Sequence, residues 1–186
     1  MKEKLAIFDL DGTLFDTCYA NYFSYNEAIK QLGYEEVDFE RFRAEAFGKS
    51  YKRFLPQFIQ GISDREMKKI HDIKTKIYID QALDKCVKNE GLFDIIDGVS
   101  DTYYIALVTT ASRECVNAIL ACNNVAEKFD VIISGDDVEK PKPDMEGYMK
   151  VVEQFGVRKE NVIVFEDDPQ CVETIRNENI TVMQVY

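Results

Sequence analysis

The alternation of hydrophobic and polar positions divides the chain into short apolar runs separated by amphipathic stretches. Five runs have the length and composition of strands, and they lie at 5–8, 105–108, 131–133, 162–165 and 181–185. The stretches between the last four carry apolar residues at helical spacing. Strands that alternate with helices predict an α/β fold, here a Rossmann-like three-layer α/β/α core built on a parallel sheet.

Polar residues at the edges of the amphipathic stretches indicate where helices begin and end. Ser112 and Asp144 are placed to cap helix N-termini, and Gly156 is placed to end the helix that Asp144 begins. Asp168 directly before Pro169 is typical of a helix start with proline at its first position. These signals bound three helices between the predicted strands.

The segment 17–88 departs from this rhythm because its apolar residues recur at helical spacing and no strand-like run interrupts them. Ser63 and Glu66 have the spacing of a capping box, with a helical apolar stripe after them. We expect an all-helical cap at 17–88, inserted into an α/β core made of residues 1–16 and 89–186.

Composition narrows the function classes. The 186-residue chain has a net charge of −11, so its average field repels polyanions, and we expect no nucleic-acid partner. No apolar run approaches the roughly 18 residues of a membrane span, and no secretory segment precedes the first strand, so we expect no membrane partner. The five cysteines lack disulfide or zinc spacing. This pattern favours reduced thiols and predicts a cytoplasmic protein.

Two carboxylates, Asp9 and Asp11, follow the first predicted strand, and Gly12 and Thr13 come next. Acids beside a buried strand are rare unless they are paired or bind a metal. Ligands bind at the carboxyl ends of strands in open α/β sheets. The position therefore indicates a site.

The next three strands also end in chemically suggestive residues, which are Thr109 and Thr110, then Lys140 and Lys142, then Glu166, Asp167 and Asp168. In a parallel sheet these ends share one edge. Carboxylates suit a hard cation such as Mg²⁺, while hydroxyl, amide and ammonium groups suit an anion. The edge is thus predicted to bind a cation and an anionic substrate together.

In this order the motifs resemble those of the haloacid dehalogenase superfamily phosphatases. The first motif corresponds to Asp9-Leu10-Asp11-Gly12-Thr13, the second to Thr109, the third to Lys140 and the acidic fourth to Glu166-Asp167-Asp168. The helical insertion at 17–88 resembles the mobile cap of that superfamily.

The resemblance implies a role for each matched residue. Asp9 would be the nucleophile that forms an aspartyl-phosphate, and Asp11 the general acid and base. Thr109 would hydrogen-bond a phosphoryl oxygen. Lys140 would neutralise the phosphate and position Asp9.

The same resemblance implies a magnesium site. Mg²⁺ would be held by the Asp9 carboxylate, the Asp11 carbonyl and Asp167. Glu166 would tune the metal from outside its ligand set, and Thr13 would orient Asp11.

Several positions leave alternatives open. Thr110 stands where many relatives have Asn or Ser, and it is a candidate for binding the substrate. Asp168 is read as a helix cap, although relatives often have Ser there and a third acid near the metal is the alternative. Lys142 competes with Lys140, and Lys140 is preferred because it precedes the first proline of the match. In the cap, Lys49 and Arg53 are candidates for contacting the leaving group of the substrate.

The leading interpretation is an Mg²⁺-dependent phosphatase that hydrolyses a small phosphorylated metabolite. A phosphosugar mutase, which would return the phosphoryl group to a sugar, is the nearest alternative. A catalytically silent binding module is a further alternative from another class, and the intact motif set argues against it. The sequence does not specify the substrate or the oligomeric state.

Overall fold

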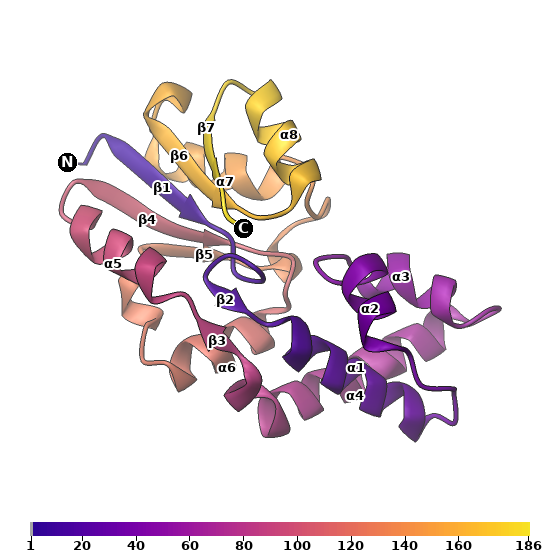
Figure 1. Cartoon of the computed structure of the whole chain (residues 1–186). Coiled ribbons are helices and arrows are strands. Elements are labelled where there is room, and N and C mark those ends of the chain that lie inside the picture. The colour runs from indigo at the N-terminus through magenta and orange to yellow at the C-terminus, as the bar shows by residue number, and fades with distance from the viewer. Residues whose placement is uncertain (1) are drawn as a thin grey trace. The chain divides into compact units, whose positions relative to one another are not determined.

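A computed structural model describes residues 2–186 of the chain. Within this range the largest sheet has five strands, β1 (Lys4–Phe8), β4 (Tyr103–Val108), β5 (Val131–Ile133), β6 (Val162–Glu166) and β7 (Thr181–Gln184). They are parallel and run in the order β5-β4-β1-β6-β7 (Figure 1). The predicted α/β fold with a parallel sheet is confirmed, and each strand agrees with its apolar run to within two residues.

The central position of β1 brings the strand ends together. Ile7 pairs with Ala106 of β4 on one side and with Val164 of β6 on the other. The carboxyl ends of all these strands share one edge because the strands are parallel. The residues that follow β1, β4 and β6 are therefore neighbours.

Helices cover both faces of this sheet, with α5 (Glu90–Val99) and α6 (Arg113–Cys122) on one face and α7 (Glu146–Phe155) and α8 (Pro169–Asn177) on the other (Figure 1). The face under α7 and α8 is closed by a buried cluster that joins strand residues such as Leu5 and Val164 to helix residues such as Val151 and Ile175. Burial of this apolar area anchors both helices to the sheet.

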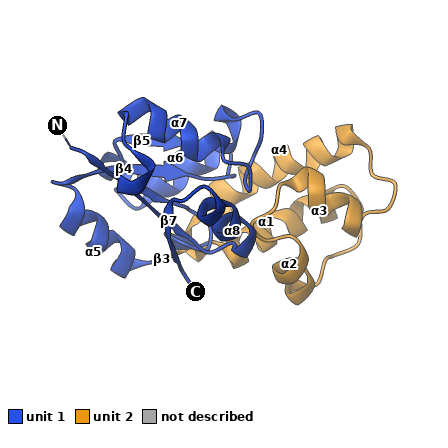
Figure 2. Cartoon of the chain, turned by 90° about the horizontal axis from the view of Figure 1, so that it is seen from above, with its two compact units in different colours: residues 1–16, 88–186 blue, residues 17–87 orange. Residues whose placement is uncertain are grey.

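The chain divides into two compact units, Met1–Asp16 with Lys88–Tyr186, and Thr17–Val87 (Figure 2). The second unit holds α1 (Cys18–Gln31), α2 (Phe39–Glu45), α3 (Tyr51–Phe58) and α4 (Asp64–Gln81). The short strands β2 (Phe15–Asp16) and β3 (Val87–Lys88) pair in a small sheet of their own. The division of the chain into a catalytic core and a cap at 17–88 stays a prediction.

The helical unit has its own aromatic core. Phe54 packs edge to face against Tyr25 and Phe42, with ring centroids 5.0 and 5.8 Å apart, and the Tyr25 and Phe42 rings are tilted at 6.0 Å. Ser63 and Glu66 form the predicted capping box at the start of α4. None of the helices in the described range 2–186 is long and apolar enough to cross a lipid bilayer.

The beginning of α7 differs from the prediction. Met145, and not Asp144, occupies the N-cap position, and the helix begins at Glu146. The first helical backbone bond runs from Met149 N–H to the Met145 carbonyl, at 2.9 Å. The Asp144 carboxylate accepts the Glu146 N–H at 2.9 Å, so it still satisfies a donor at the helix start.

Candidate active site

Asp9 directly follows the central strand, and its side chain is enclosed. The residue is 6% exposed, and its N–H donates to the Phe165 carbonyl at 3.0 Å, which extends the β1–β6 ladder. The sheet therefore holds the Asp9 backbone in place. A buried carboxylate without compensating partners is strongly disfavoured, so its neighbours must supply positive charge or hydrogen-bond donors.

Lys142 supplies that compensation. Its Nζ lies 2.6 Å from Asp9 Oδ1 and 2.8 Å from Glu166 Oε2. The three side chains are 7%, 8% and 2% exposed, respectively, so water screens these pairs only weakly. Burial acts to lower the pKa of Lys142, but the negative charges of Asp9 and Glu166 outweigh it and raise that pKa well above its usual value. The ammonium is therefore the stable form.

The expected assignment of this role to Lys140 is wrong. Lys140 is exposed, and its backbone N–H donates to Glu146 Oε2 at 2.8 Å. Lys142 is the lysine that reaches Asp9. Each lysine precedes a proline, so the local pattern did not distinguish them. The path of the loop between β5 and α7 decides which lysine enters the site.

Tyr148 on α7 completes the pocket around Lys142. Its hydroxyl donates to Glu166 Oε2 at 2.7 Å, and its ring lies 5.0 Å from Lys142 Nζ. The residue is fully buried. Tyr148 was not singled out in the sequence analysis. The available signal was its hydroxyl, because a buried tyrosine needs a hydrogen-bond partner.

The turn after β1 fits closely against Asp167. Thr13 Oγ1 donates to Asp167 Oδ1 at 3.0 Å, so Thr13 orients Asp167. That Thr13 orients Asp11 stays a prediction. Gly12 has φ +95°, and a Cβ added there would lie 2.3 Å from Asp167 Oδ2. Glycine is thus required both for the backbone conformation and for the approach of Asp167. Asp11 lies in the same turn, which a Gly12 N–H to Phe15 carbonyl bond of 2.8 Å closes.

The second strand end forms a tight, polar turn. Thr109 is 3% exposed, and its Oγ1 accepts the Ala111 N–H at 3.0 Å. Ser112 caps α6, as predicted, by accepting the Cys115 N–H. A Cβ on Gly135 would lie 2.5 Å from the Thr110 carbonyl, so the loops after β4 and β5 are in close contact. The turn places Thr109 and Thr110 where a helix N-terminus can receive an anion.

Three acids form a cluster suited to a cation. Ligand oxygens of Asp9, Glu166 and Asp167 all lie within 4.8 Å of one another. Burial, and then the nearby Glu166 charge, raise the pKa of Asp9 well above its usual value and that of Asp167 to about 6. The Lys142 ammonium bonds to Asp9 and Glu166 but not to Asp167, so the three carboxylates leave an excess negative charge that a divalent cation would neutralise. The donors are all oxygen, so the residues present fit Mg²⁺.

Asp168 lies at the start of α8. Its Oδ1 accepts the N–H groups of Gln170 and Cys171 at 2.6 and 3.2 Å, which is the capping role that the following proline predicted. The alternative, a third acid turned to the metal, receives no support from these bonds.

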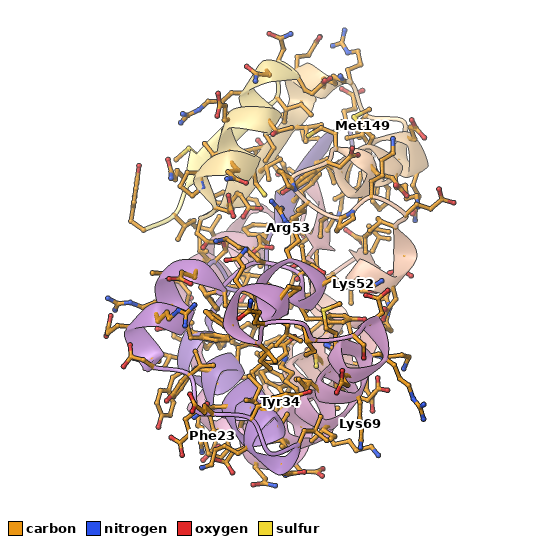
Figure 3. All side chains as sticks on the ribbon, turned by 90° about the vertical axis from the view of Figure 1, so that its right-hand side faces the viewer. Phe23, Tyr34, Lys52, Arg53, Lys69 and Met149 are labelled. Atoms are coloured by element: carbon orange, nitrogen blue, oxygen red, sulfur yellow. The ribbon has the colours of Figure 1, made fainter. Side chains whose placement is uncertain are left out.

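The two cap candidates are described within their own unit. Lys49 is exposed, and its Nζ donates to the Glu45 carbonyl at 2.8 Å. Arg53 is exposed beside Lys52 on α3 (Figure 3), whereas the next residue, Phe54, is buried in the core of the helical unit. Contact of Lys49 or Arg53 with a substrate stays a prediction.

The fold and the strand-end residues together define a class of protein. The protein is an α/β enzyme. One edge of its parallel sheet carries a carboxylate paired with a lysine, further acids and a polar helix N-terminus. Such an edge can bind a cation and an anionic substrate side by side.

The chain belongs to the haloacid dehalogenase-like hydrolases, whose family profile matches residues 6–185. It is 30% identical to a phosphorylated carbohydrates phosphatase of Thermotoga maritima, over 94% of this chain and 81% of that protein. It is 27% identical to the pyrophosphatase PpaX of Halalkalibacterium halodurans, over 90% and 76%. The solved structure of CbbY from Rhodobacter sphaeroides in complex with phosphate has the same fold, with a TM-score of 0.86, 24% identity and coverage of 100% and 88%.

Proposed function

We propose that this protein is an Mg²⁺-dependent phosphatase that hydrolyses small phosphomonoesters through an aspartyl-phosphate on Asp9. The observation that carries the proposal is the buried Asp9 carboxylate at the end of the central strand, 2.6 Å from the Lys142 ammonium. Family membership supports the reaction class, and the relatives named as phosphatases support a phosphorylated substrate.

In the first step an Asp9 carboxylate oxygen attacks phosphorus, and the bond from phosphorus to the leaving oxygen breaks. Asp11 protonates that oxygen as it departs. In the second step Asp11 takes a proton from water, the water oxygen attacks phosphorus, and inorganic phosphate leaves with Asp9 regenerated. Asp9 must be ionised to attack in the first step, and it leaves phosphorus as a carboxylate in the second. Lys142 favours this negative charge on Asp9.

The remaining residues hold charge and orientation. Lys142 would stabilise the negative charge of Asp9 and of the transferring phosphoryl group, and the turn at Thr109 and Thr110 would donate hydrogen bonds to phosphoryl oxygens. Asp9, Asp167 and the Asp11 carbonyl would hold Mg²⁺, with Glu166 beside them. When bound, the metal would neutralise charge between the nucleophile and the phosphate.

We propose a small phosphorylated metabolite of the cytoplasm as the substrate, with phosphorylated carbohydrates the first class to test. The support is the similarity to the Thermotoga maritima phosphatase named for such substrates. The exposed Lys49 and Arg53 of the helical unit are the proposed contacts for the leaving group.

The test is phosphate release from p-nitrophenyl phosphate and from a panel of sugar phosphates, phosphoglycolate and pyrophosphate, with Mg²⁺ and with EDTA. We expect Mg²⁺-dependent release by the native chain and none by Asp9→Asn. Asp101→Asn is the matched control, because Asp101 is exposed and precedes β4, at the other end of the strand from Thr109. Activity that survives in Asp9→Asn would refute the covalent mechanism, and isomer formation without phosphate release would indicate the mutase.

A further inference from the structure

A glutamate at the start of α7 binds the backbone that leads to Lys142. Glu146 Oε1 accepts the Glu139 N–H at 3.0 Å, and Glu146 Oε2 accepts the Lys140 N–H at 2.8 Å. Two consecutive backbone donors are thus held by the two oxygens of one carboxylate. Hydrogen bonds to a charged acceptor are roughly twice as strong as neutral ones, so this is a firm attachment for a loop.

Lys150, one helical turn further along α7, adds a second attachment to the same segment. Its Nζ donates to the Asp137 carbonyl and to Glu146 Oε1, each at 2.6 Å. The contact with Lys150 and the two backbone N–H groups lower the pKa of Glu146 to about 2. Glu146 is therefore ionised at neutral pH and keeps its full acceptor capacity. We call Glu146 and Lys150 the α7 clamp.

Other bonds hold the segment 137–142 near its ends. The Asp137 carboxylate accepts from Ser134 and Arg113, and the Pro141 carbonyl accepts the Asp144 N–H at 3.2 Å. Pro141 and Pro143 flank Lys142 and carry no backbone N–H, so neither can donate a hydrogen bond. The α7 clamp forms hydrogen bonds with the backbone of residues 137, 139 and 140, shortly before Lys142. Lys142 must then place its ammonium 2.6 Å from Asp9 and 2.8 Å from Glu166 in a buried pocket. Small displacements of the loop would move the ammonium out of that position.

We propose that Glu146 and Lys150 are positioning residues for the reaction, because they hold the segment 137–140 in the path that delivers Lys142 to Asp9. This inference rests on the proposed function. Neither residue touches the substrate or the reacting atoms. Their effect on catalysis passes through Lys142.

The exposure of the clamp separates this role from general structural support. The Glu146 and Lys150 side chains are 23% and 43% exposed, so truncating either leaves no buried cavity. The matched control is Glu178→Ala, which removes a carboxylate that accepts from Lys159 at 2.6 Å in the same unit. That pair does not touch the segment 137–142.

The first experiment is a double-variant cycle that measures steady-state phosphate release from p-nitrophenyl phosphate with Mg²⁺ over a range of substrate concentrations, with more enzyme for the slow variants. We expect Glu146→Ala to lower kcat about tenfold with KM within about twofold, because misplacing a catalytic group lowers the rate without removing substrate contacts. In the Lys142→Ala background the same change should cost less than about twofold, since coupled residues are not additive. Glu146→Gln keeps one acceptor oxygen and should lie between native and Glu146→Ala.

The second experiment does not need activity. Hydrogen exchange of the Glu139 and Lys140 amides should accelerate at least about tenfold in Glu146→Ala and stay unchanged in Glu178→Ala, because exchange follows local opening. The proposal is overturned if Glu146→Ala leaves the exchange rate of these amides unchanged. It is also overturned if Glu146→Ala lowers kcat equally in the native and Lys142→Ala backgrounds. If the native chain hydrolyses no phosphomonoester, the proposed function fails, and exchange alone then decides whether the clamp exists.

Discussion

Replacing Tyr148 with phenylalanine removes one hydrogen bond and leaves the ring in place. The Tyr148 hydroxyl donates to Glu166 Oε2 at 2.7 Å, and burial raises the pKa of Tyr148 well above its usual value, so the phenol stays protonated. Tyr148 and Glu166 are 0% and 2% exposed. Water therefore cannot replace the lost donor without opening the core. Glu166 keeps its contact with Lys142 in the variant.

The magnitude follows from the type of bond. A hydrogen bond to a charged group contributes about 1.5–3 kcal/mol, so we expect Tyr148→Phe to lower the free energy of unfolding by about 2 kcal/mol. For a chain of this size each kcal/mol corresponds to roughly 2–4 °C in Tm, so the expected shift is about 4–8 °C. Differential scanning calorimetry measures this shift in Tm.

Tyr34→Phe is the matched control, because the Tyr34 hydroxyl donates to Glu66 Oε1 at 2.8 Å in the helical unit. Both residues of that pair are partly exposed, so water replaces the lost bond and the Tm loss should be clearly smaller. The reasoning is refuted if the two variants lose equal Tm, or if Tyr148→Phe costs less than about 0.5 kcal/mol, the range of ordinary surface changes.

Three further outcomes are expected. Gly12→Ala should abolish phosphatase activity and lower Tm, because the alanine Cβ would lie 2.3 Å from Asp167 Oδ2 and the backbone φ is +95°. A native kcat and Tm in this variant would contradict the prediction. The Mg²⁺ concentration that half-activates the enzyme should rise as pH falls through about 6, the raised pKa of Asp167, because protons compete with the metal for this carboxylate. Thr13→Val should move the rise to higher pH, because the Thr13 hydrogen bond lowers the pKa of Asp167, and a half-activating concentration independent of pH would refute this reasoning. Hydrogen bonds from Ser63 lower the pKa of Glu66 from 4.5 to about 2, so the ionised Glu66 carboxylate stabilises the fold fully above pH 4.5, and this contribution is lost as pH falls towards 2. Between pH 4.5 and 2 the Tm measured by calorimetry should therefore drop less in Glu66→Gln than in the native chain.

The strands were predictable because the central sheet of an α/β fold is buried on both faces. Continuous apolar runs such as 5–8 and 162–165 stand out against the amphipathic stretches around them. The acids after β1 and β6 were predictable for the same reason, since a charged residue directly after such a run is conspicuous. Helix caps with a local pattern, such as Ser63 with Glu66, were also found and are confirmed.

The errors lie where side chains from another element decide the path of the backbone. Lys140 and Lys142 have equivalent local surroundings, each with a proline after it. The carboxylate of Glu146 binds the backbone at Lys140, which directs the first lysine to the surface and the second into the site. The misplaced start of α7 at Asp144 belongs to the same loop. A hydrogen bond between a side chain of one element and the backbone of another cannot be predicted from the local sequence.

The hydrogen bonds of the three clustered acids assign them different tasks. Among the described residues, Glu166 accepts bonds from Lys142 and Tyr148 on Oε2 and from the Asp168 N–H on Oε1. Asp9 accepts one side-chain bond, from Lys142, and Asp167 one, from Thr13. A carboxylate whose charge is already met by several donors has less need of a cation. Glu166 is therefore suited to hold Lys142 in place, while Asp9 and Asp167 keep the oxygens with which a divalent ion would be bound.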